Sequence, residues 1–63
     1  MNKAERVAAT LESYLDARDH RIKVAAGFLD GGSLDEWKAT ALNALAAEGK
    51  ARETFVIALL HLP

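Results

Sequence analysis

The sequence contains no cysteine, and its only proline is the last of its 63 residues. The absence of cysteine excludes disulfide bonds and thiolate metal sites. Neither sign of charge dominates, because eight basic and nine acidic residues give a formal net charge of −1. This balance indicates no general affinity for polyanions or for an anionic membrane surface.

Long apolar segments are also missing. The longest, Phe55 to Leu60, extends through His61 to Leu62 and is far shorter than the roughly 20 residues that cross a bilayer. The amino terminus becomes acidic at Glu5 and has no apolar region of a secretory signal. These features predict a cytoplasmic protein without membrane contact.

What the chain does have is the composition of a helical protein, rich in alanine and leucine with evenly spread charges. We expect one small all-α domain over residues 1–63. A chain of this length buries only roughly 60% of the surface that its unfolded form exposes, so a monomer would be marginally stable. With disulfides excluded, oligomerisation is the remaining way for such a chain to bury more surface and become stable.

The spacing of apolar residues predicts a first helix over about 3–29. One stripe runs along a single face of this helix, formed by Val7, Leu11, Leu15, Ile22, Ala26 and Leu29. At about 1.5 Å per residue the helix would be roughly 40 Å long. That length suits an elongated hairpin and not a rounded monomer.

A loop over 30–33 separates this helix from a second one over about 34–61. Gly31 and Gly32 allow a sharp reversal, and Ser33 with Glu36 matches the capping box that starts a helix. Gly49 leaves two alternatives open, because a glycine inside a helix costs about 1 kcal/mol relative to alanine. The second helix is either continuous, with a possible kink, or broken there to give a three-helix bundle.

Two helices of equal length around a tight loop predict an antiparallel hairpin. In this hairpin Leu15 would lie near Glu48, and Val7 or Ala8 near Phe55. The apolar residues exceed what one contact can cover, so we expect a symmetric dimer that forms a four-helix bundle. The surface assigned to self-association or to a different protein comprises Trp37, Phe55, Val56, Leu59, Leu60 and Leu62.

Residues able to carry chemistry are few, and we expect no catalytic residue, metal site or cofactor. Asp16 and His20 stand four residues apart, but no third ligand follows at a recognisable spacing, and a solvated charged belt explains them better. His61 lies among leucines near the terminus. The two glycines of the loop match no phosphate-binding motif, because no strand precedes them. The sequence therefore predicts that the protein is not an enzyme.

Nucleic-acid binding is the alternative function. Arg18, Arg21 and Lys23 lie on the first helix, and a dimer would double them into a basic strip, although acidic residues intersperse them. In length and hairpin format alone the chain resembles small plasmid copy-control proteins that bind paired RNA loops. The leading prediction is a small regulator or inhibitor, of the kind carried by phages and plasmids, that binds another protein through an apolar helical surface.

Overall fold

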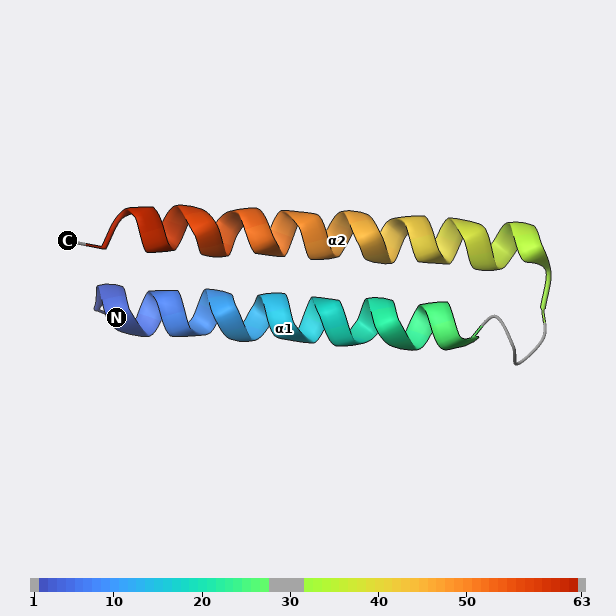
Figure 1. Cartoon of the computed structure of the whole chain (residues 1–63), viewed down its shortest axis with the longest axis horizontal. Coiled ribbons are helices and arrows are strands. Elements are labelled where there is room, and N and C mark those ends of the chain that lie inside the picture. Colours follow the sequence, from blue (N-terminus) through green and yellow to red (C-terminus); the bar gives the residue numbers. More distant parts are fainter. Residues whose placement is uncertain (1, 28–31, 63) are drawn as a thin grey trace.

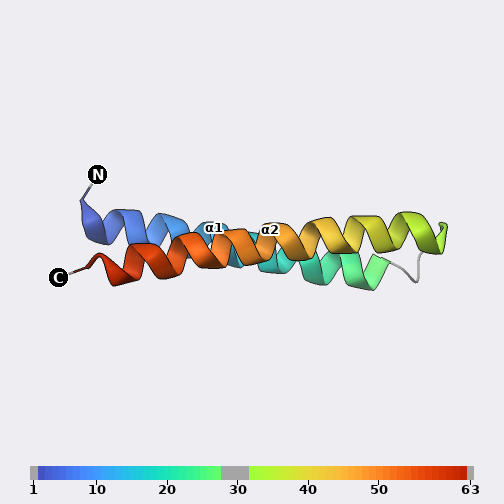
Figure 2. The same cartoon turned by 90° about the horizontal axis from the view of Figure 1, so that it is seen from above.

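Two antiparallel helices form the whole of the described structure, a computed structural model that covers residues 2–27 and 32–62 (Figure 1). Helix α1 spans Lys3–Gly27 and helix α2 spans Leu34–Leu60. They pack against each other along their length and cross at a shallow angle (Figure 2). The hairpin measures 47 × 14 × 13 Å between Cα atoms. The predicted all-α helical hairpin is confirmed.

Local side-chain contacts explain where the helices begin. The Asn2 side-chain oxygen accepts the Glu5 backbone N–H at 2.8 Å, and Ser33 Oγ accepts the Glu36 N–H at 3.0 Å. Each contact satisfies one amide that has no partner within the helix. Gly32 has a φ of +103°, a left-handed conformation that glycine adopts without steric cost. The capping role predicted for Ser33 is confirmed.

Helix α2 continues without a break through Gly49. The three-helix alternative is therefore wrong for the described part of the chain. The spacing of apolar residues on both sides of Gly49 is that of one helix, and packing against α1 supports the helix across this position. The predicted end of the first helix at residue 29 and the first two residues of the predicted loop over 30–33 lie outside the described residues.

The contact between the helices, here called the seam, is made by half-buried residues spaced alternately three and four apart. This spacing is that of a coiled coil. In α1 the seam residues are Val7, Thr10, Tyr14, Ala17, Arg21, Val24 and Gly27, and in α2 they are Trp37, Ala41, Ala44, Glu48, Ala51, Phe55 and Ala58. Ala44, at 3% exposure, is the most deeply buried of them and the one described residue that is buried rather than half-buried or exposed. Alanines thus bring the helices close together without enclosing bulky side chains.

The seam corrects the stripe predicted for the first helix. Of the residues in that stripe, only Val7 lies in the seam, whereas Leu11, Leu15 and Ile22 are 37–49% exposed. Ala26 is exposed as well, and the predicted place of Leu29 lies outside the described residues. The leucine stripe is real, but it runs beside the seam, because the small and aromatic residues one position away pack against α2.

The side-chain partners predicted across the hairpin were wrong, although the offset between the two helices is close to the predicted one, since Val7 lines a hollow with Ala58 and Thr10 lines one with Thr54. Glu48 pairs with Arg21 and not with Leu15, and Phe55 stacks on Tyr14 and not on Val7 or Ala8. Long side chains lean toward the N-terminus of their own helix, so in this antiparallel pair the side chains that meet belong to residues offset along the hairpin axis. The ion pair and the aromatic pair both join residues that are distant in sequence.

Candidate protein-binding face

Seven large aliphatic side chains on the flank of the seam form what we call the apolar face. Each of them is between 37% and 57% exposed. Helix α1 contributes Leu11, Leu15 and Ile22, and helix α2 contributes Leu42, Leu45, Val56 and Leu59. Exposed aliphatic side chains gathered in this way are typical of a surface that binds another protein.

Helical geometry places both halves of the apolar face on one side of the hairpin. Successive residues of an α-helix are turned by 100°. Leu11 and Ser13 therefore lie on opposite sides of the seam in α1. Leu59 and Thr54 likewise lie on opposite sides of the seam in α2. Ser13 and Thr54 line the same hollow, so their two flanks meet on one side. The aliphatic flanks of both helices therefore share the other side. The side that carries Ser13 and Thr54 is called the polar face below.

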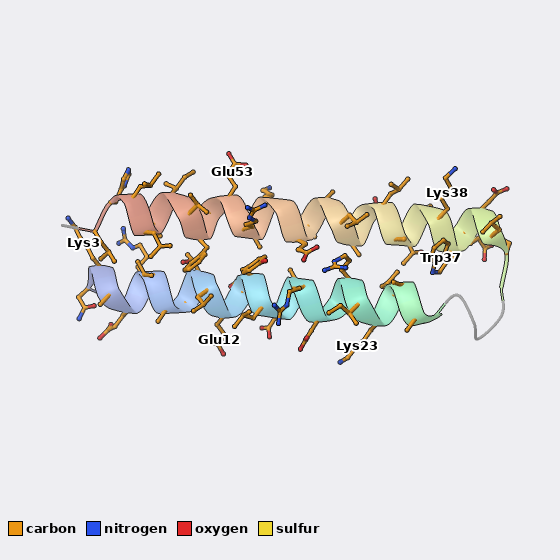
Figure 3. The ribbon with its side chains drawn as sticks, in the orientation of Figure 1. Lys3, Glu12, Lys23, Trp37, Lys38 and Glu53 are labelled. Atoms are coloured by element: carbon orange, nitrogen blue, oxygen red, sulfur yellow. The ribbon has the colours of Figure 1, made fainter. Side chains whose placement is uncertain are left out.

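Two arginines interrupt the apolar face near its middle. Arg18 and Arg52 are both exposed and occupy the same flanks as the aliphatic residues. Acidic residues lie further out around each helix, and the side chains of Glu12 and Glu53 point away from the opposite helix (Figure 3). The face thus has two apolar halves, a cationic centre and an acidic outer rim.

An ion pair ties the two helices together at the middle of the seam. Arg21 Nε and Nη2 donate to the two Glu48 carboxylate oxygens at 2.6 and 3.2 Å, and the Glu48 side chain is only 15% exposed. The pKa of Arg21 is raised, first by this hydrogen bond and then by the charge of Glu48. Stability contributed through Arg21 is therefore present below the ordinary arginine pKa and is lost only at higher, strongly alkaline pH.

The indole of Trp37 closes the loop end of the hairpin. Its Nε1 donates to the Val24 carbonyl at 2.9 Å. Val24 lies in the last described turn of α1 and Trp37 in the first turn of α2, so this hydrogen bond joins the two helices at that end of the hairpin. The structure therefore assigns Trp37 to the contact between the two helices.

The surface predicted from the sequence is divided among several places. Trp37 and Phe55 lie in the seam, where they are half-buried, whereas Val56 and Leu59 belong to the apolar face. Leu60 is 75% exposed on the outer side of α2, and Leu62 follows the end of the helix.

The apolar face includes five residues that were not in the predicted surface. From α1 these are Leu11, Leu15 and Ile22, which the sequence had assigned to the contact with α2. From α2 they are Leu42 and Leu45. The seam residues of α1 form a second three–four pattern in the sequence, displaced by one position from the leucine stripe. Assigning this second pattern to the contact with α2 would have placed the α1 leucines on the exposed face.

The three basic residues proposed for nucleic-acid contact are not brought together. Arg21 is engaged with Glu48 in the seam, and Arg18 lies on the flank of the apolar face. Lys23 points away from α2 (Figure 3), on the side of the polar face. A continuous basic strip would need all three on one side of the helix.

Within residues 2–27 and 32–62, no three histidine, aspartate or glutamate side chains gather at one place where they could hold a metal ion. Asp16 and His20 thus have no third such ligand beside them in that part of the chain. Neither described helix is long and apolar enough to cross a bilayer.

Comparisons with known proteins identify no relative. The sequence matches no protein-family model. Neither the curated proteins nor the solved structures give a match.

Proposed function

We propose that this protein is a non-enzymatic association module, in which the apolar face packs against the same face of a second copy. The product is a four-helix bundle. One observation carries the proposal: the described chain buries only Ala44, while it exposes seven large aliphatic side chains on one side. A hairpin of this kind has most of its potential core on its surface, and a second hairpin would cover it.

The extent of the face suits a dimer. The Cα atoms alone span 47 by 14 Å, which is roughly 650 Å² before side chains are added, and a standard interface buries about 800 Å² per partner. Completing the burial of a half-exposed leucine gains roughly 1 kcal/mol. Two copies of the face would gain on the order of 10 kcal/mol, comparable with an association cost of about 4–15 kcal/mol.

The charges on the face can be accommodated in such a dimer. The long side chains of Arg18 and Arg52 can extend along the interface with their guanidinium groups at its edge. At that edge the outer rim of the second copy presents Glu12, Asp19 and Glu53. A symmetric dimer repeats each contact twice, so each cation on one copy meets an acidic rim on the other.

In this proposal the chain performs no bond chemistry, and its regulatory or inhibitory role depends on binding another protein as an assembled bundle. Dimerisation supplies the stable scaffold that a lone hairpin of this length lacks. The polar face and the outer sides of the helices remain available to that further partner.

Two exposed residues of α2 provide a matched test. Leu45 on the apolar face is 49% exposed, and Ile57, on the polar-face side, is 48% exposed. We expect light scattering to give twice the mass of one chain for the unmodified protein and for Ile57→Lys. Leu45→Lys is expected to shift the protein toward monomer at micromolar concentration.

Circular dichroism on the same samples shows whether each variant is helical. A monomeric unmodified protein under these conditions would contradict the proposal. Equal loss of the dimer in both variants would also contradict the proposal, because assembly would then not depend on the apolar face.

A further inference from the structure

A groove opens on the polar face where the first turns of α1 meet the last turns of α2. Its volume is about 500 Å³, within the range of roughly 300–1,000 Å³ that holds small ligands. We call it the open-end groove. Its lining residues are Lys3, Arg6, Val7, Thr10, Thr54, Ile57, Ala58 and His61.

The lining combines basic groups with an aliphatic floor. Lys3, Arg6 and His61 provide the basic groups, and among the described residues no carboxylate side chain lines the groove. The side chain of Lys3 extends from the start of α1 toward the end of α2 (Figure 3). The aliphatic floor is formed by Val7, Ile57 and Ala58.

The two threonines in the lining already use their hydroxyl hydrogens. Thr10 Oγ1 donates to the Val7 carbonyl at 2.8 Å, and Thr54 Oγ1 donates to the Lys50 carbonyl at 3.1 Å. A ligand in the groove therefore finds its strong donors on the Lys3 and Arg6 side chains. An ammonium and a guanidinium together favour an anion, and the guanidinium can hold a carboxylate with two parallel hydrogen bonds.

We propose that the open-end groove binds an amphipathic carboxylate, whose head group contacts Lys3 and Arg6 and whose aliphatic chain lies on Val7, Ile57 and Ala58. The groove lies on the side opposite the apolar face, so it remains open when two copies pair. This binding is independent of the proposed dimer, and the monomeric Leu45→Lys variant should retain it.

Decanoate, used below its micellar concentration, is the probe, with acetate and decyltrimethylammonium as comparisons. Acetate has the charge without the chain, and decyltrimethylammonium has the chain with the opposite charge. We expect decanoate to bind more tightly than either. Amide NMR shifts should move at Thr10, Thr54 and Ala58 and stay unchanged at Leu15 and Leu45 on the apolar face.

Charge-neutralising variants complete the test. Lys3→Gln and Arg6→Gln should each weaken decanoate binding roughly tenfold, the loss expected when a charge-assisted hydrogen bond of about 1.4 kcal/mol is removed. Lys23→Gln is the matched control, because Lys23 is also an exposed lysine of α1 but lies at a distance from the groove. Absence of decanoate binding, equal affinity in the Lys3 and Lys23 variants, or shifts centred on the apolar face would each overturn the proposal.

Discussion

Replacing Ala44 by leucine tests whether the seam depends on close approach of the helices. Ala44 is 3% exposed, and neighbouring seam positions on both helices also carry alanine. A leucine adds three carbon atoms where the packed helices leave no room. Overpacking of this kind costs typically about 1–3 kcal/mol. For a domain of this size each kcal/mol lowers the unfolding temperature by about 4–8 °C, so we expect a fall on the order of 10 °C.

Thermal unfolding followed by circular dichroism measures this fall, at one fixed protein concentration because assembly would make the midpoint depend on concentration. Ala46→Leu is the control: Ala46 lies two residues further along α2 and is exposed, so its substitution should change stability by less than about 0.5 kcal/mol. If Ala44→Leu were as stable as the unmodified protein, the seam would not be closely packed. The reasoning would also fail if both variants lost the same stability.

Two further substitutions test individual contacts. Trp37→Phe keeps an aromatic ring but removes the hydrogen bond to the Val24 carbonyl. Urea unfolding should therefore show a free energy of unfolding lower by about 1 kcal/mol. An unchanged midpoint would mean that water replaces the indole N–H at no cost in stability. Gly49→Ala should increase the free energy of unfolding by about 0.5–1 kcal/mol, because no heavy atom outside the local helix lies within 4 Å of the added Cβ. A decrease measured for Gly49→Ala would show that this position needs a glycine for a reason outside the isolated hairpin.

The beginnings of both helices could be predicted because the interactions that set them are local. Ser33 and Glu36 are three residues apart, and the Glu36 backbone N–H that donates to the Ser33 hydroxyl lies within the same turn. Gly32 adopts its left-handed conformation immediately before that cap. Such contacts involve only residues that are neighbours in the sequence, so they form together with the helix and do not depend on how the two helices pack.

The candidate face could be predicted only in part. An excess of apolar surface follows from composition and spacing, and Val56 and Leu59 belong both to the predicted surface and to the apolar face. The leucines of α1 were instead assigned to the interior of the hairpin. Periodicity identifies an apolar side of a helix, but it does not distinguish the side that meets α2 from the side that remains exposed.

The sequence by itself determined that two long helices form, where each begins, and that they carry more apolar surface than one contact can cover. Only the tertiary structure decided which side of α1 faces α2 and which side chains meet across the seam. The reason is that the deciding contacts, Tyr14 with Phe55 and Arg21 with Glu48, join residues far apart in the chain. Their geometry, and the close approach permitted by Ala44, exist only once both helices have come together.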